Sequence, residues 1–223
     1  MRPEAIVFDF DLTLADSMPA FVACHQHAAR TLDLPPPTAE AVGRTIGTPL
    51  PLGFRKLYGI DDDALAARYI HVYQAHADLI MTDLTVMLPG ATETIRRLAA
   101  DGFRLGIVSQ KRRYRIDDVL RREGLLPLFG AVLGDEDVPA FKPDPRGLML
   151  AVERLNGTPA TSLYVGDTVI DAETAQRAGI AFVAVLSGET TADEFAPYDW
   201  LGIIAGIADL PDVLLLDATA GRP

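Results

Sequence analysis

The sequence contains a single cysteine, Cys24, which excludes an intramolecular disulfide. No apolar run reaches the roughly 18 to 20 residues that a membrane-spanning helix requires. The N-terminus leads directly into a short apolar segment, without the basic region and longer apolar stretch of a secretory signal. Together these absences predict a cytoplasmic protein with no membrane partner.

Positive charge is also scarce, because 20 lysine and arginine residues stand against 31 aspartate and glutamate residues, for a formal net charge of −11. The resulting long-range repulsion opposes binding to nucleic acid or to an anionic membrane, so neither is expected as a partner. The 223 residues, 49% of them hydrophobic, suffice for one sizeable core and a smaller insert. The chain needs no second subunit to fold, and we expect a monomer or a homodimer.

An apolar run near the N-terminus ends at two carboxylates. Residues 6–8 are β-branched or aromatic and predict a buried parallel strand, which Asp9 and Asp11 follow. Ligands of open α/β sheets bind beyond the carboxyl ends of the strands, so the two acids form a candidate site. The alternative is a strand followed by an Asx-type turn.

Two later apolar runs also end at polar residues. One leads to Ser109, and another leads to Asp167, with Asp171 four positions further on; Lys142 lies between these runs, directly before a proline. Each residue has an ordinary alternative, because serine and aspartate are common helix N-caps and a lysine before proline is usually a solvated loop residue. Those alternatives explain each residue by itself, but they do not explain why all of these residues occur together in one chain.

Five short apolar runs predict the strands of a sheet, namely residues 6–8, 105–108, 131–134, 163–166 and 181–186. Most of the segments between them have helical periodicity, and this alternation predicts an α/β fold with a doubly wound parallel sheet. The region from about residue 18 to residue 87 contains no convincing strand, and residues 21–32 and 64–79 are typical of amphipathic helices. This region is therefore expected to be a helical insert.

These motifs closely resemble those of the haloacid dehalogenase-like (HAD) superfamily, in the order that the superfamily requires. The first motif, Asp-x-Asp-x-Thr, is matched at Asp9, Asp11 and Thr13. Ser109 and Lys142 match the second and third motifs, and the fourth is matched by the sequence from Gly166 to Gly179 that contains both later acids. The resemblance covers essentially the whole chain and is strongest to the phosphoglycolate phosphatase-like subgroup.

The resemblance implies a domain organisation. Residues 1–16 and 88–223 would form a Rossmann-like HAD core in which the first strand is central, flanked by the second and fourth predicted strands. Residues 17–87 would form a small helical cap domain, inserted after the first strand, that closes over the site and selects the substrate. The four histidines all lie in this insert, at spacings that do not form a metal site.

The resemblance also implies a mechanism. Asp9 would attack phosphorus to form an aspartyl phosphate, and Asp11 would protonate the leaving group and then activate water. Mg²⁺ suits the oxygen-only ligands, which would include the backbone carbonyl of Asp11. The expected catalytic residues are Asp9, Asp11, Ser109 and Lys142, the expected metal ligands are Asp9, Asp11, Asp167 and Asp171, and the expected substrate-binding residues are Thr13, Arg44, Gln110 and Lys111.

Within the insert, residues 43–50 are similar to the substrate-specificity loop of phosphoglycolate phosphatases and related pyrophosphatases. Arg44 is the candidate clamp for a second anionic group of the substrate, because a planar guanidinium pairs bidentately with carboxylate or phosphate. The alternative is that Arg44 is a solvated turn residue.

A basic run, Lys-Arg-Arg-Tyr-Arg, occupies residues 111–115. If Ser109 or Gln110 caps the following helix, these cations lie in its first turn, where the helix dipole disfavours positive charge. We therefore expect at least one of them to serve the anionic substrate, with Gln110 at the family's usual asparagine position and Lys111 as the retained cation. For Arg113 and Arg115 a solvated surface role is equally open.

The acid at position 11 distinguishes branches of the superfamily, because dehalogenases release an unprotonated halide and lack this residue. Asp11 thus favours phosphoryl transfer, and the resemblance implies a Mg²⁺-dependent phosphatase that acts on a small phosphorylated metabolite similar to phosphoglycolate. Pyrophosphatases, sugar-phosphate or nucleotide phosphatases, and phosphomutases of the β-phosphoglucomutase type share the core motifs, so these alternatives stay open.

Overall fold

The computed structural model describes residues 3–214 of the chain. The chain divides into two compact units, one comprising the chain up to Ala15 together with the chain from Met87 onward, and the other Asp16–Val86. Every helix among the described residues is too short or too polar to cross a lipid bilayer.

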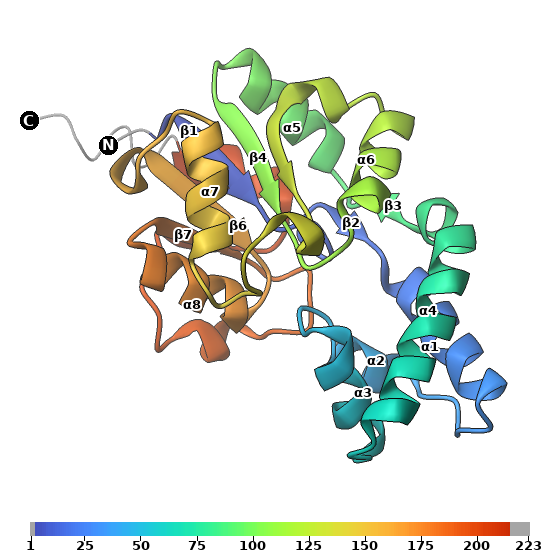
Figure 1. Cartoon of the computed structure of the whole chain (residues 1–223). Helices are drawn as coiled ribbons and strands as arrows, with labels where there is room; N and C mark the ends of the chain where they lie inside the picture. Colours follow the sequence, from blue (N-terminus) through green and yellow to red (C-terminus); the bar gives the residue numbers. More distant parts are fainter. Residues whose placement is uncertain (1–2, 215–223) are drawn as a thin grey trace, which may run out of the picture. The chain divides into compact units, whose positions relative to one another are not determined.

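The first unit is built on a six-stranded sheet in which neighbouring strands run parallel (Figure 1). In spatial order the strands are β5 (Phe129–Leu133), β4 (Arg104–Val108), β1 (Ala5–Phe8), β6 (Ser162–Gly166), β7 (Ala181–Val185) and β8 (Gly202–Ile204). The predicted doubly wound parallel sheet is confirmed, with the first strand between the second and fourth predicted strands. The predictions omit β8, because its three residues are too few to form a clear apolar run.

Both faces of the sheet are buried. Ile6 and Phe8 of β1 belong to one apolar cluster, whereas Ala5 and Val7 belong to another, because successive side chains of a strand point to opposite faces. Two helices cover each face, α5 (Ala91–Ala100) and α6 (Arg113–Arg122) on the first and α7 (Arg146–Arg154) and α8 (Val169–Ala178) on the second. A strand buried on both faces requires a continuous apolar sequence, which is why β1 is recognisable in the sequence.

Among the described residues of this unit, the segments between strands and α-helices also contain short 3₁₀ helices, at Leu126–Leu128, Asp135–Asp137, Pro159–Thr161, Ala192–Phe195 and Ile207–Asp209. In addition, two short segments of the chain pair as a two-stranded sheet, β2 (Ala15–Asp16) with β3 (Val86–Met87). The expectation of no strand between residues 18 and 87 is therefore wrong at β3. Two residues give no periodicity from which a strand can be recognised.

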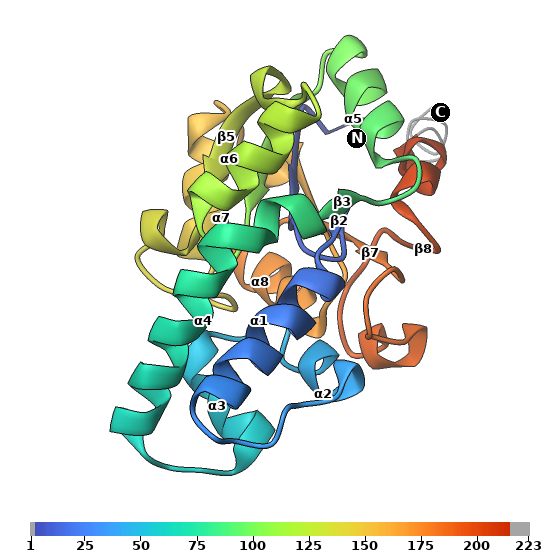
Figure 2. The same ribbon diagram turned by 90° about the vertical axis from the view of Figure 1, so that its right-hand side faces the viewer.

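The second unit is helical, with α1 (Met18–Thr31), α2 (Ala39–Gly43), α3 (Leu50–Tyr58) and α4 (Asp63–Leu84). The helices α1 and α4 lie side by side (Figure 2) and bury Cys24, Tyr69 and Met81 in a common core. These two helices contain most of the segments predicted at residues 21–32 and 64–79. The predictions omit α2 and α3, because α2 is very short and α3 contains a proline and a glycine, both poor helix formers.

Three of the four histidines of this unit, His25, His27 and His76, contact other rings. His25 is buried, its Nδ1 lies 2.9 Å from the hydroxyl oxygen of Tyr69, and burial lowers the pKa of its imidazole to about 4. The rings of His27 and His76 stack with their centroids 3.9 Å apart. Within residues 3–214, the one group of three or more side chains that could hold a metal ion contains no histidine.

Candidate active site

The register of the sheet places the motif residues at one edge. Phe8 of β1 is level with Ile107 of β4 and with Val165 of β6. Asp9, which follows β1, donates its backbone N–H to the carbonyl oxygen of Val165 over 2.9 Å. Because parallel strands end at the same edge, the residues that follow β1, β4 and β6 emerge together there.

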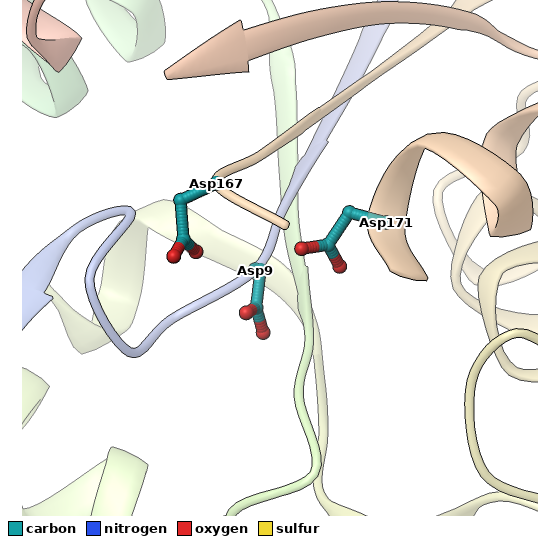
Figure 3. Close-up of side chains that lie close together, drawn as sticks. All are labelled: Asp9, Asp167 and Asp171. Atoms are coloured by element: carbon teal, nitrogen blue, oxygen red, sulfur yellow. The ribbon is translucent and has the colours of Figure 1, made fainter. Parts of the chain in front are cut away.

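Three carboxylates meet at this edge, those of Asp9, Asp167 and Asp171 (Figure 3). Each offers one oxygen atom, and these atoms all lie within 4.8 Å of one another. All three residues are buried, so water does little to screen their mutual repulsion. Such a group is stable only if protons or cations compensate its charge.

Lys142 supplies one compensating cation. Its Nζ lies 3.0 Å from Oδ1 of Asp9 and 2.6 Å from Oδ1 of Asp171, and all three side chains are almost fully buried. Burial alone would lower the pKa of this ammonium group, but the charges of Asp171 and Asp9 raise it well above its ordinary value. Lys142 is therefore protonated and holds two of the three carboxylates.

Asp171 is fixed by the first turn of α8. The backbone N–H of Thr168 donates to its Oδ2 over 3.1 Å and the Thr168 hydroxyl over 2.6 Å, while the Asp171 N–H donates back to that hydroxyl over 3.2 Å. This reciprocal pair is a capping box in which Thr168 is the N-cap residue and Asp171 the third residue of the helix, so neither Asp167 nor Asp171 is the N-cap that the sequence alternative allows. The hydroxyl of Tyr164 donates to the other oxygen over 2.8 Å.

The carboxylate group fits a divalent metal. Oδ1 of Asp167 accepts a hydrogen bond from the Thr13 hydroxyl over 2.8 Å, whereas its buried Oδ2 accepts none from any residue that the structure describes. A set of oxygen-only ligands with an unsatisfied carboxylate oxygen is the donor set that Mg²⁺ prefers. Asp9, Asp167 and Asp171 would hold such an ion.

Burial controls the protonation of the group in the absence of a metal. It raises the pKa of Asp9 to about 7, with the positive charge of Lys142 opposing the shift and the charges of Asp171 and Asp11 adding to it. Burial, together with the charges of Asp171 and Asp9, raises the pKa of Asp167 well above its usual range. The metal-free site therefore retains protons that a bound cation would displace.

This predicts a pH-dependent stabilisation by magnesium. A raised carboxyl pKa means that the folded protein binds protons more tightly than the unfolded chain, so metal-free stability should fall as pH rises from about 4 through about 7. Mg²⁺ at ~100 times its Kd at about pH 8 should raise Tm by roughly 5–10 °C, and by less at about pH 5.5, where protons compete. Scanning calorimetry at both pH values measures the effect. Equal shifts would contradict this account of the buried acids.

Asp11 faces a different cation. Oδ1 of Asp11 lies 2.6 Å from Nζ of Lys111, and both side chains are buried. The sequence interpretation assigned Lys111 to the substrate, whereas the structure shows it paired with Asp11 across 100 positions of the chain. The carboxylate of Asp11 lies outside the group of three that could hold a metal ion.

The helix cap that the sequence allows at Ser109 or Gln110 is not formed. Helix α6 begins at Arg113 with Arg112 as its N-cap residue, so neither Ser109 nor Gln110 caps it. Instead, both carboxylate oxygens of Glu136 accept the backbone N–H of Arg113 over 3.1 Å. This remote carboxylate satisfies the helix terminus and offsets the unfavourable position of the arginines.

The basic run has acidic partners in the same segment as Glu136. Arg112 lies 3.5 Å from Asp135, and Arg113 lies 3.3 Å from Asp137. Arg115 is buried, with its guanidinium carbon 5.3 Å from the ring centroid of Tyr114. Intramolecular ion pairs thus account for Arg112 and Arg113 of the basic run, from which the sequence predicts at least one substrate contact.

The remaining predicted residues of this unit connect its loops. Ser109 is buried, and its Oγ accepts the backbone N–H of Lys111 over 3.3 Å. The amide nitrogen of Gln110 donates to the carbonyl oxygen of Lys142 over 3.3 Å, linking the second and third motifs. Thr13 contacts Asp167, as described above. The structure thus assigns Gln110 and Thr13 contacts that hold other site residues in place.

Arg44 belongs to the helical unit. It is the C-cap residue of α2, and its exposed guanidinium forms an ion pair with Glu40 four positions earlier. An exposed i,i+4 pair of this kind contributes only about 0.3–0.5 kcal/mol, so it does not prevent Arg44 from binding another anion.

Some functional residues escape sequence reasoning. Tyr164 is an aromatic residue inside an apolar strand, and nothing in its pattern shows that its hydroxyl contacts both Lys142 and Asp171. Ser187 and Gly188 follow β7 without a recognisable motif, although they contact the site. The only available signal is their position shortly after the end of a strand of the parallel sheet.

Known proteins are similar to this chain in sequence and in fold. A sequence model of haloacid dehalogenase-like hydrolases matches residues 6–185. The phosphoglycolate phosphatase of Cereibacter sphaeroides is 32% identical over 216 residues, covering 94% of this chain and 96% of that protein. That of Pseudomonas putida is 31% identical over 193 residues, covering 83% of this chain and 70% of that protein.

Solved structures agree. A protein from Bacteroides fragilis that is classed as a haloacid dehalogenase-like hydrolase is 38% identical, with a TM-score of 0.89 over 93% of this chain and 99% of that chain. The chain therefore belongs to the family of haloacid dehalogenase-like hydrolases. Within it the chain is similar to the phosphoglycolate phosphatases, which confirms the predicted resemblance. It is an enzyme of the phosphoric monoester hydrolase class, with a small phosphorylated substrate.

Proposed function

We propose that this enzyme is a Mg²⁺-dependent phosphatase that hydrolyses a small phosphorylated metabolite similar to phosphoglycolate through an aspartyl phosphate on Asp9. The observation that carries the proposal is the position of Lys142 between Asp9 and Asp171, beside the carboxylate of Asp167. An anionic nucleophile can approach an anionic phosphate ester only where cations offset the repulsion. This edge of the sheet provides that compensation.

Each residue then has a defined task. Asp9 attacks phosphorus, and Lys142 neutralises the nucleophile and the transferring phosphoryl group. A Mg²⁺ ion held by Asp9, the Asp11 backbone carbonyl, Asp167 and Asp171 would add positive charge at the phosphoryl oxygens. Ser109 binds a phosphoryl oxygen through its hydroxyl, and Gln110 keeps Lys142 in place through its bond to the Lys142 carbonyl oxygen.

Asp11 is the general acid and base of this mechanism. It protonates the leaving alkoxide in the first step, and it takes a proton from the water that hydrolyses the aspartyl phosphate in the second. The contact of 2.6 Å with Lys111 holds its carboxylate in a fixed position between the two steps. We assign Lys111 this positioning role in addition to the substrate contact expected from the sequence.

Residues 1–16 and 88–223 form the catalytic core in this proposal, and residues 17–87 form a cap that selects the substrate. Arg44 is the proposed clamp for the second anionic group, after exchanging its exposed Glu40 partner for the substrate. Thr13 serves the substrate indirectly by orienting Asp167. A monomer or homodimer in the cytoplasm is the corresponding expectation.

A phosphate-release screen with Mg²⁺ tests this function. Phosphoglycolate should be hydrolysed faster than pyrophosphate, hexose phosphates or nucleoside monophosphates, and activity should vanish with excess chelator and return with Mg²⁺. Release that persists in excess chelator would rule out the proposed metal dependence. Isomerisation of a sugar phosphate without net phosphate release would show that the enzyme is a phosphomutase and not a phosphatase.

The same screen tests the clamp. Arg44→Ala should raise KM for phosphoglycolate roughly tenfold or more, because a charge-assisted hydrogen bond is lost, and should leave p-nitrophenyl phosphate nearly unaffected. Arg68→Ala removes another exposed arginine of the same helical unit and serves as the control. Equal effects of Arg44→Ala on both substrates would show that Arg44 is not a clamp.

A further inference from the structure

Two residues shortly after β7, Ser187 and Gly188, contact the candidate site and have no role in the mechanism above. We call them the 187–188 strap. Ser187 contacts Leu12 in the loop of the first motif, and Gly188 lies against Asp167 in the loop of the fourth motif. The strap thus touches both loops that contribute carboxylates to the site.

The Ser187 contact supports an unusual backbone conformation. Leu12 has a φ of +60°, in the left-handed region that a leucine rarely adopts. Its N–H donates to the carbonyl oxygen of Ala15 over 2.7 Å, and its own carbonyl oxygen accepts the hydroxyl of Ser187. Both backbone polar groups of Leu12 are therefore satisfied, and the turn between Asp11 and Thr13 is held from two sides.

The Gly188 contact is a close approach of backbone to carboxylate. A Cβ atom at position 188 would overlap Oδ2 of Asp167 and lie 2.9 Å from its carboxylate carbon and 3.2 Å from its Cβ. Gly188 is absent from the glycines with positive φ, so its backbone is one that other residues adopt. Glycine is needed here for space and not for conformation.

Asp167 is consequently confined on two sides. The Thr13 hydroxyl donates to Oδ1, and the backbone of Gly188 lies against Oδ2, which accepts no hydrogen bond from any residue of the described range 3–214. A side chain at position 188 would force Asp167 to rotate away from the Thr13 hydroxyl or would push the strap outward. Either movement changes the separation between Asp167 and Asp9.

We propose that the 187–188 strap positions Asp167 against Asp9 and thereby sets the affinity of the site for its divalent cation. Ser187 and Gly188 are positioning residues, because they act through Leu12 and Asp167 and contact no reacting group. This inference rests on the proposed function in that the cation is taken to be Mg²⁺. Residues that orient metal ligands typically change metal affinity by roughly 10- to 100-fold when they are altered.

The test is a calorimetric titration of the metal-free protein with Mg²⁺. Gly188→Ala should raise the Kd for Mg²⁺ about tenfold or more. Gly206→Ala is the matched control, because it makes the same chemical change in the same unit, where the added Cβ would meet nothing within 4 Å. Its Kd should equal that of the wild type. A folded Gly188→Ala variant with an unchanged Kd would overturn the proposal.

Ser187→Ala decides the matter if Gly188→Ala fails to fold, because it removes one hydroxyl and adds no atoms. Its Kd for Mg²⁺ should rise about three- to tenfold, as expected for the loss of a hydrogen bond of about 1 kcal/mol. A wild-type Kd in Ser187→Ala would contradict the positioning role. A wild type that binds Mg²⁺ but releases no phosphate would instead overturn the proposed function alone.

Discussion

Replacing Asp9 by asparagine should reduce phosphate release by about five orders of magnitude, the scale seen when a covalent nucleophile is removed. An amide oxygen is a far weaker nucleophile than a carboxylate. Among the described residues, Asp9 and Asp171 are the carboxylates that pair with Lys142, and Asp171 is held by α8, so no other carboxylate can replace Asp9. Steady-state release of phosphate from p-nitrophenyl phosphate and from phosphoglycolate measures the loss.

The variant should remain folded. Asp9 is buried among other acids, and burial raises its pKa to about 7, so a neutral side chain of the same shape relieves repulsion at neutral pH. The metal-free Tm of Asp9→Asn at about pH 8 should therefore equal or exceed that of the wild type. Asp199→Asn, at an exposed position, controls for the change of one charge. Turnover within tenfold of the wild type would exclude Asp9 as the nucleophile.

Replacing Asp11 by asparagine should divide the reaction into its two steps. With p-nitrophenyl phosphate the leaving phenolate needs little protonation, so attack by Asp9 should continue in part. Hydrolysis of the aspartyl phosphate requires a base, which asparagine cannot supply, and should slow by about 10²- to 10⁴-fold. Rapid-quench measurements should show a burst of nitrophenol followed by very slow turnover, whereas phosphoglycolate, whose leaving alkoxide needs a proton, should give no burst.

A second variant separates this chemistry from charge imbalance. Asp11→Asn leaves the buried ammonium group of Lys111 beside a neutral amide, and removing one partner of a buried ion pair is destabilising. The double variant Asp11→Asn with Lys111→Met restores the charge balance and should keep the burst. If neither variant gives a burst while Mg²⁺ affinity is unchanged, Asp11 is required for the first step with either leaving group.

The strands of the core were predictable because their physical requirements are local. A strand buried on both faces is apolar along most of its length, so β1 and the parts of β4 and β6 that follow their polar first residues are recognisable in the sequence. Parallel strands end at one edge, and this alone predicts that Asp9, Ser109 and Asp167 emerge together. The acids of the site therefore follow from the sequence and the geometry of a parallel sheet.

The partners of those residues were not predictable, because they depend on contacts between distant segments. Lys111 pairs with Asp11 across 100 positions, and Glu136 satisfies the start of α6 from 23 positions away. Local rules placed a cap at Ser109 or Gln110, since they consider only neighbouring residues. The need for glycine at position 188 is equally invisible in the sequence, because it arises from the side chain of Asp167.

The measurement that tests the central claim most directly is the identification of the phosphorylated residue. Asp11→Asn is mixed with p-nitrophenyl phosphate and Mg²⁺, quenched in acid during the burst, and analysed by intact-protein and peptide mass spectrometry. The account predicts one added phosphoryl group, located on the peptide that contains Asp9 and absent when Asp9 is also replaced by asparagine. A phosphoryl group on any other residue, or a burst without covalent phosphate, would contradict the account.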